Sequence, residues 1–255
     1  MRKPLIIKGK TIGQGRPLIC VPVMAPDAEH IVAEIQELAA QGTDMVEWRL
    51  DAFAQVTSLN AIRDVLERVE PYLEDTILVY TFRSKRQGGL LELSAEQIYD
   101  IHQVGAESKA VDFVDVEFFE AEKVHAEIKE LQKLGAHVIT SHHDFAQTPD
   151  AAVIAMLLEK MAESTTDMVK LAVMPNSVED VLHLLEQTAQ FHAKYPTCPL
   201  ITMSMGSLGV VSRVAGETFG SCVTFGAGHK ASAPGQIEAQ KLAVILDALR
   251  QGDEA

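Results

Sequence analysis

The sequence predicts a closed barrel of eight parallel β-strands, each followed by a helix. Two sequence patterns and the absence of one motif support this prediction. Eight short runs rich in β-branched and aromatic residues alternate with longer amphipathic stretches over the 255 residues. Such alternation predicts parallel strands joined by right-handed crossovers. No Gly-x-Gly-x-x-Gly motif follows the first strand, so an open dinucleotide-binding sheet loses its main support. We therefore expect a single (β/α)8 domain, a TIM barrel, over residues 1–255.

The predicted strands share short apolar runs bounded by turn-forming residues. In chain order they are Leu18–Val23, Asp44–Leu50, Thr76–Phe82, Val111–Val116, His137–His142, Met168–Val173, Leu200–Met205 and Val223–Phe225. The segment before them, residues 4–16, holds two strand-like pieces around Gly9. This arrangement predicts a β-hairpin that caps the bottom of the barrel, at the amino ends of the strands.

The predicted helices show apolar residues at helical spacing. They are Ala28–Ala40, Leu59–Val69, Ala95–Glu107, Ala121–Leu134, Ala151–Met161, Val178–His192 and Ile237–Leu249. Gly42 and Gly135 stand just after two of them, where a left-handed backbone conformation commonly ends a helix.

Charge and cysteine usage exclude several classes of function. The formal net charge is −14, which argues against a nucleic-acid surface, because such surfaces are normally basic. The N-terminal apolar run is too short for a signal peptide, and no segment reaches the roughly 18 apolar residues of a membrane span. Cys20, Cys198 and Cys222 show no metal-binding spacing and are typical of buried thiols in a reducing cytoplasm. We expect a cytoplasmic protein without metal, nucleic-acid or membrane partners.

Catalytic residues of such barrels lie at the carboxyl ends of the strands, so the polar residues there are the candidates. Glu47 and Arg49 end the second predicted strand on one face, and Arg83 follows the third. An arginine inside a barrel needs a counter-charge or a bound anion. The pattern fits either a structural network of acids and arginines or a polar floor that binds hydroxyl groups.

A histidine pair and a lysine are the strongest candidates for chemistry. His142 and His143 end the fifth predicted strand on opposite faces, and the pattern alone does not choose between them as a general base. Lys170 lies in the sixth predicted strand among apolar residues. Burial disfavours the ammonium form of a lysine, and a neutral amine can attack a ketone to form an imine. The alternative is a lysine whose amine reaches the solvent at the rim.

Two glycine-rich loops follow the last two predicted strands. Residues 206–209 precede a helical segment with Arg213, and residues 226–236 end in Ser232-Ala233-Pro234-Gly235-Gln236. Loops at these positions often bind anions in barrels, although ordinary turn formation explains such sequences about as well.

Together these segments resemble the type I 3-dehydroquinate dehydratase family. The matching blocks are Glu47-Trp48-Arg49, residues 81–84 with Gly88-Gly89, residues 141–145, residues 170–175, residues 202–206 with Ser212-Arg213, and residues 231–236. The blocks span most of the chain in the expected order, and the last two are highly specific.

The resemblance implies a role for each matching residue. Lys170 would form the Schiff base, His143 rather than His142 would be the general acid and base, and Arg213 would hold the substrate carboxylate. The other substrate-binding residues would be Glu47, Trp48, Arg49, Arg83, Ser232 and Gln236, supported by Gln87 and by an apolar wall of Met203, Met205 and Phe225. The family uses no cofactor, is cytoplasmic and usually dimeric, and converts 3-dehydroquinate to 3-dehydroshikimate in the shikimate route to aromatic compounds.

Two positions depart from the family's pattern. Gln87 stands where relatives such as the enterobacterial enzymes carry a glutamate that pairs with the catalytic histidine. An amide can orient an imidazole but cannot stabilise its cation by charge, so we expect a less elevated pKa of His143 and no loss of activity. Pro22 stands where some relatives carry a serine near the substrate, which removes one hydrogen-bond donor.

Two other functions share parts of this pattern. A Schiff-base aldolase acting on sugar phosphates would use the same barrel and strand lysine, but it needs a dianion site, and only Arg213 and Lys230 flank the candidate loops. A non-catalytic binding protein of the same fold would gain little from a buried lysine. We therefore expect a hydro-lyase that acts through Lys170 and His143.

Overall fold

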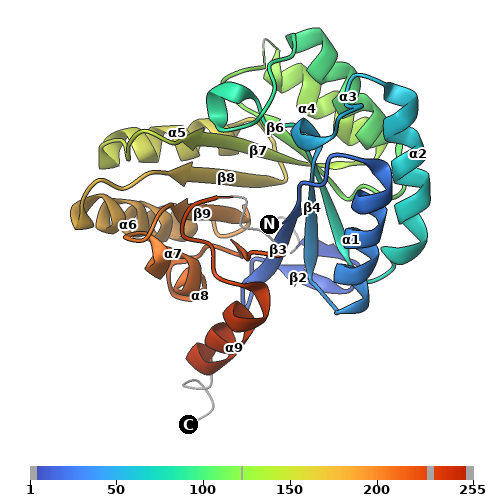
Figure 1. The fold of residues 1–255 in the computed structure, drawn as a ribbon. Coiled ribbons are helices and arrows are strands. Elements are labelled where there is room, and N and C mark those ends of the chain that lie inside the picture. Colours follow the sequence, from blue (N-terminus) through green and yellow to red (C-terminus); the bar gives the residue numbers. More distant parts are fainter. Residues whose placement is uncertain (1–4, 122, 229–232, 251–255) are drawn as a thin grey trace.

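Eight parallel strands form the centre of the molecule in the order β10-β3-β4-β5-β6-β7-β8-β9 (Figure 1). The structure is a computed structural model that describes residues 5–121, 123–228 and 233–250. The strands are β3 (Leu18–Val23), β4 (Met45–Arg49), β5 (Ile77–Thr81), β6 (Phe113–Glu117), β7 (His137–Asp144), β8 (Met168–Val173), β9 (Leu200–Ser204) and β10 (Val223–Phe225). Each strand from β3 to β8 pairs with the next one in the chain. The predicted eight-stranded parallel barrel is thus confirmed.

A narrow seam between β9 and β10 completes the barrel. One parallel bridge joins Leu200 to Ser221, and the backbone N–H of Cys222 donates to the Leu200 carbonyl at 2.8 Å. The Ser221 hydroxyl accepts from the backbone N–H of Thr202 at 3.0 Å. This seam leaves the sheet near-closed, with fewer backbone contacts than the seven strand pairs.

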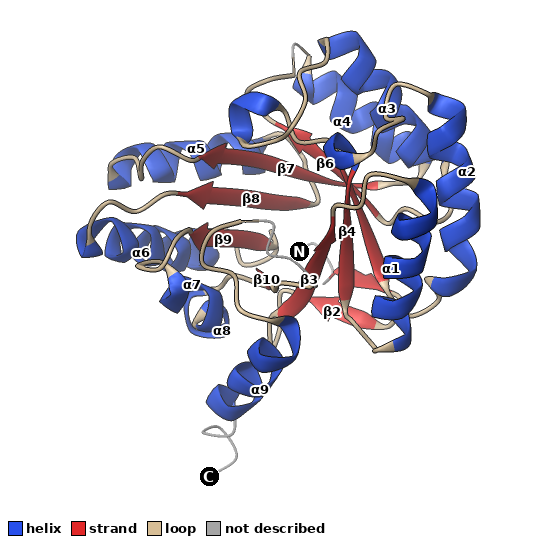
Figure 2. Ribbon diagram, viewed as in Figure 1, coloured by secondary structure: helices blue, strands red, loops and turns tan. Residues whose placement is uncertain are grey.

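Helices surround the strands on the outside (Figure 2). They are α1 (Ala28–Ala40), α2 (Leu59–Val69), α3 (Ala95–Glu107), α4 (Val124–Leu134), α5 (Ala151–Glu163), α6 (Val178–Lys194), α7 (Val210–Val214), α8 (Gly216–Phe219) and α9 (Ala239–Arg250). Capping boxes begin α3, with Ser94 and Gln97, and α6, with Ser177 and Asp180. Gly42 and Gly135 adopt positive φ angles of 73° and 111°, as predicted for residues that follow helices. No helix in the described ranges is long and apolar enough to cross a membrane.

Alternation along the strands separates two apolar layers. Met45, Ile77 and Phe113 belong to a buried cluster inside the barrel, whereas Val46 and Trp48 belong to a cluster between the strands and the helices. Because successive side chains point to opposite faces of a strand, residues two positions beyond an interior residue also point inward. The interior face therefore continues into the polar residues at the carboxyl ends of the strands.

The N-terminal hairpin closes the bottom of the barrel, as predicted. Its strands β1 (Leu5–Ile7) and β2 (Lys10–Ile12) pair antiparallel, and Ile7 and Ile12 join the interior cluster. Lys8 Nζ lies 2.6 Å from Asp112 Oδ2 and donates to the Thr76 carbonyl at 2.9 Å. Asp112 and Thr76 directly precede β6 and β5, so the hairpin contacts the amino ends of the strands.

The predicted element boundaries differ from the structure by a few residues. Strand β7 continues two residues past the predicted end at His142, and α4 begins at Val124 instead of Ala121. The predicted helical segment with Arg213 is α7, whereas the short helix α8 was missing from the prediction, because its four residues carry little helical periodicity. All three cysteines are free and buried, as expected.

Gly105 in the last turn of α3 provides a test of packing between helix and sheet. A Cβ at this position would lie 2.5 Å from the Tyr80 ring. Alanine is favoured over glycine by about 1 kcal/mol inside helices, whereas overpacking a core costs about 1–3 kcal/mol. We expect Gly105→Ala to lower the free energy of unfolding by about 1–2 kcal/mol in urea, and to be neutral or stabilising in a Tyr80→Leu background. An increase in stability with Tyr80 present would contradict this packing.

Candidate active site at the carboxyl ends of the strands

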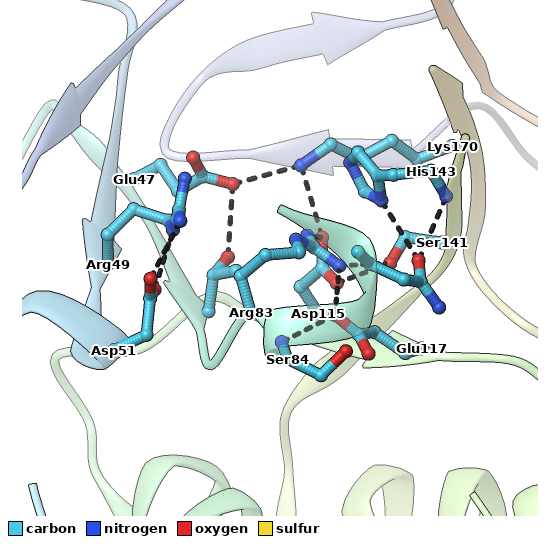
Figure 3. A network of polar contacts seen from close by, with 12 residues as sticks. Glu47, Arg49, Asp51, Arg83, Ser84, Asp115, Glu117, Ser141, His143 and Lys170 are labelled. Carbon is cyan, nitrogen blue, oxygen red and sulfur yellow. Dashed lines mark hydrogen bonds and ion pairs between the residues drawn. The ribbon is translucent and has the colours of Figure 1, made fainter. Parts of the chain in front are cut away.

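A cavity opens at the carboxyl ends of the strands and brings together residues from all parts of the chain. Side chains from β4, β7 and β8 point into it (Figure 3), and Phe225 of β10 also lines it. Its lining residues are Glu47, Arg49, Arg83, Gln87, Gly88, His143, Phe145, Lys170, Ala172, Met203, Met205, Phe225, Ala233 and Gln236. Most of the predicted site residues thus meet in one place.

Lys170 lies at the floor of the cavity, only 3% exposed. Its Nζ lies 2.9 Å from Glu47 Oε1 and 3.1 Å from Asp115 Oδ2, and 4.6 Å from the centroid of the Phe225 ring. The prediction of a buried strand lysine is confirmed, and the alternative of an amine in solvent is wrong. Although the neighbours of Lys170 in the sequence are apolar, two carboxylates contact its amine.

Arg83 and Asp115 form the centre of the network below Lys170. Arg83 donates to Asp115 at 2.9 Å, to Glu117 at 2.9 Å and to the Ser141 hydroxyl at 3.0 Å. Ser141 in turn donates to Asp115 Oδ1 at 2.6 Å. Burial by itself raises the pKa of Asp115, but the charges of Arg83 and Lys170 outweigh it and hold that pKa well below its usual range. Asp115 is therefore an ionised carboxylate.

His143 follows Ser141 by two residues on β7, so both point inward, and Ser141 pairs in register with Lys170 on β8. The backbone N–H of His143 donates to Gln87 Oε1 at 2.9 Å, and Nδ1 of the ring lies 3.3 Å from the same oxygen. Because that oxygen only accepts, Nδ1 carries the hydrogen and Nε2 keeps its lone pair. Burial, followed by the charges of Arg83 and Lys170, lowers the pKa of His143 well below 6.5. The imidazole is therefore neutral at neutral pH.

The side chains of His142 and His143 point to opposite faces of β7. His142 does not line the cavity in the described residues, and its ring packs edge-on against Phe119 with centroids 5.2 Å apart. It faces the helix layer, so the choice of His143, which came from the family resemblance, agrees with the geometry.

Arg213 from α7 is buried at 1% exposure without an acidic partner among the described residues. It donates to the carbonyls of Phe225 and Pro234 at 3.4 and 3.0 Å, while Nε has no hydrogen-bond partner in the part of the chain that the structure describes. Desolvation lowers its pKa to about 10, which still leaves it charged at neutral pH. A buried guanidinium without a carboxylate partner is a natural site for a bound anion.

The loop after β10 packs against the loop after β9. Gly206 N–H donates to the Pro234 carbonyl at 3.2 Å. Gly235 has a φ of +78°, and a Cβ there would lie 2.2 Å from the Gly206 oxygen, so only glycine allows this close approach. The packing brings Gln236 to the cavity. The predicted Ser232 lies outside the described residues.

The position of Trp48 in the structure corrects its predicted role at the site. Its side chain is fully buried and packs edge-on against Phe53 and Tyr80, at 5.8 and 5.7 Å between ring centroids. Trp48 lies between Glu47 and Arg49 and therefore points to the opposite face of β4, into the core under the helices. The structure contradicts the assignment of Trp48 as a substrate-binding residue. Met203, Met205 and Phe225 do line the cavity.

The sequence interpretation missed three buried acids, Asp115, Glu117 and Asp51. Asp115 lies in an apolar strand with Glu117 two residues later, a spacing that could have indicated an acidic inward face. Asp51 follows β4, and its two oxygens accept from Arg49 at 2.7 and 2.8 Å. The arginines thus have acidic counter-charges, as the interpretation of a structural network of acids and arginines predicted.

The chain matches known proteins over nearly its full length. The family model "Type I 3-dehydroquinase" matches residues 19–253. The chain is 41% identical over 250 residues to a 3-dehydroquinate dehydratase of Klebsiella pneumoniae, covering 98% of this chain and 100% of the relative. It is 39% identical over 252 residues to that of Bacillus licheniformis, covering 98% and 99%.

Solved structures give the same result. A type I 3-dehydroquinate dehydratase from Clostridium difficile superposes with a TM-score of 0.94 at 39% identity, covering 99% of this chain and 100% of that one. The Enterococcus faecalis protein gives 0.89 at 35% identity, covering 96% and 99%. N-acetylneuraminate lyase from Mycoplasma synoviae, at 0.56 and 14% identity, covering 92% and 75%, shares the fold alone. The chain belongs to the type I 3-dehydroquinase family.

Proposed function

We propose that the chain removes water from 3-dehydroquinate through an imine on Lys170, with His143 as the general acid and base. The main support for this proposal is the position of the Lys170 amine. It is buried at the barrel mouth and held by Glu47 and Asp115 at 2.9 and 3.1 Å. A pure binding protein has no use for a buried amine in this position. The Clostridium difficile relative is described with covalently modified comenic acid, which supports a covalent route.

The first step needs a base, because the ion-paired amine must lose a proton before it attacks. His143 lies on the strand next to Lys170, and its Nδ1–H is directed at Gln87, so the Nε2 lone pair is free for the cavity. Burial and two nearby cations keep this imidazole neutral. Lys170 then adds to the ketone carbon, and the resulting carbinolamine loses water to give an iminium.

The iminium acts as an electron sink for the elimination. His143 removes a proton from the carbon next to the iminium, and the electron pair of that C–H bond forms an enamine. The enamine expels the hydroxyl group one carbon further on, which leaves as water with the proton from His143. A second water hydrolyses the conjugated iminium and releases 3-dehydroshikimate and Lys170. The water lost in iminium formation is regained here, so the net reaction releases one water.

Different charged residues of the cavity bind different groups of the substrate. The substrate carboxylate lies at Arg213, which has no acidic partner in the described chain and a free Nε. Glu47, Arg49 and Arg83 already form ion pairs and bind ring hydroxyls, together with Gln236. The assignment of Ser232 rests on the resemblance. Met203, Met205 and Phe225 form the apolar wall.

We also propose a homodimer in a reducing, cytoplasmic setting, without a cofactor. The resemblance supports the dimer, and three free cysteines support the compartment. Helices α5 and α6 present Val153 and Met156 at 40% and 43% exposure and Val178 and Leu182 at 59% and 58%. Neighbouring exposed apolar residues of this kind favour association.

Light scattering on a size-exclusion column tests the dimer. We expect a mass of twice 27.8 kDa, and Leu182→Glu should shift the mass toward one chain. Glu186→Lys on the same helix serves as a control for surface charge. A single-chain mass for the unaltered protein would refute the dimer.

Replacing Lys170 tests the covalent route. Lys170→Ala should lower kcat for 3-dehydroquinate on the order of 10⁴-fold or more, measured by the absorbance of the conjugated product. Lys170→Arg should be equally inactive, because it keeps a cation beside Glu47 and Asp115 but forms no imine. Lys194→Ala, at an exposed lysine, should leave the rate unchanged. Substantial activity in either Lys170 variant would exclude the imine.

Gln87→Glu tests the role of His143. A carboxylate beside the imidazole stabilises its cation, so the pKa of His143 rises. Because the base must be neutral, the acid limb of the pH profile of kcat/KM should lie below pH 6.5 in the unaltered chain and move to higher pH in Gln87→Glu. Gln190→Glu, on the exposed side of α6, should cause no such shift. Identical profiles for the unaltered chain and Gln87→Glu would show that His143 does not govern this limb.

A further inference from the structure

Asp51 contacts two separate parts of the cavity. It lies in the short turn Leu50–Ala52 after β4, and its side chain is fully buried. Oδ1 and Oδ2 accept from Nε and Nη2 of Arg49 at 2.7 and 2.8 Å (Figure 3). Such a two-point pair fixes the plane of the guanidinium as well as its charge. Arg49 can turn only if this pair breaks.

The same carboxylate also holds the loop between β5 and α3. Asp51 Oδ2 accepts from the backbone N–H of Leu90 at 3.1 Å, directly after Gly88-Gly89. Gly89 N–H donates to the Ser84 carbonyl at 2.8 Å, and Gln87 on this loop accepts from His143. One buried acid thus contacts both Arg49 and the loop that orients the proposed base.

We propose that Asp51 is a positioning and specificity residue that neutralises Arg49, so that Arg49 meets an uncharged hydroxyl and the substrate carboxylate goes to Arg213. This inference rests on the proposed function, in which Arg49 contacts the substrate. Nε–H and one N–H of Nη2 donate to Asp51, whereas the two N–H groups of Nη1 have no hydrogen bond to a described residue. The remaining donors of Arg49 carry a charge that Asp51 compensates, which suits a hydroxyl, while Arg213, which has no acidic partner among the described residues, suits an anion.

The inference predicts a change in anion binding that a purely structural role would not produce. In Asp51→Asn the charge of Arg49 is no longer compensated, so inorganic phosphate should become a stronger competitive inhibitor, roughly 10-fold or more. The KM for 3-dehydroquinate should rise roughly 10-fold with a smaller fall in kcat. Inhibition constants and KM do not depend on the fraction of folded protein, so partial unfolding cannot imitate this result. Glu120→Gln, which frees Arg86 at the same loop, should leave both values unchanged.

A double-variant cycle separates this inference from the proposed function. Asp51→Asn should have no further effect on phosphate inhibition in an Arg49→Gln background, because the uncompensated charge is gone. Equal effects of Asp51→Asn in both backgrounds, or unchanged phosphate inhibition in Asp51→Asn alone, would overturn the role of Asp51 and leave the Lys170 chemistry standing. If Arg49→Gln alone changed neither KM nor kcat, the substrate contact of Arg49 would be refuted, and the inference with it.

Discussion

The ion pairs of Lys170 with Glu47 and Asp115 constrain the rest of the barrel mouth. Two acidic side chains inside a barrel are costly unless each is paired and hydrogen-bonded. Arg83 and Ser141 meet the needs of Asp115, and Thr81 donates to Glu47 at 3.1 Å. Because each polar group depends on the next one, the network holds the amine in one place. The reaction needs such a fixed amine, and it also needs a nearby base to take its proton.

Most of the fold followed from the sequence, because a buried parallel strand and an amphipathic helix have different periods. The strand Leu18–Val23 and the helices Ala28–Ala40 and Leu59–Val69 agree with the structure to the residue. The boundary of β7 was missed because His143 and Asp144 are polar residues that continue a strand into the site. The start of α4 was misplaced because apolar spacing alone does not identify the first turn of a helix.

The candidate site was predictable where a charged residue interrupts an apolar strand, as at Lys170. The site was less predictable where neighbouring residues of one strand differ only in the face to which their side chains point. Trp48 stands inside a block of site residues, yet the alternation of β4 turns it into the core. Asp51 lies outside any strand, two residues after Arg49, and only the three-dimensional path of the loop brings the backbone N–H of Leu90 to its carboxylate. A contact between residues that are 39 positions apart produces no local sequence pattern from which it could be predicted.

Within the described residues, the site is therefore a network of ion pairs with one cation that lacks an acidic partner, Arg213, and one neutral base, His143. Reductive trapping tests the central claim, the imine on Lys170, most directly. Borohydride added to the protein during turnover of 3-dehydroquinate reduces an imine to a stable amine, and peptide mass spectrometry locates it. We expect one adduct, on the peptide that contains Lys170, together with loss of activity. An adduct on another residue, or full activity after treatment with no adduct, would contradict it.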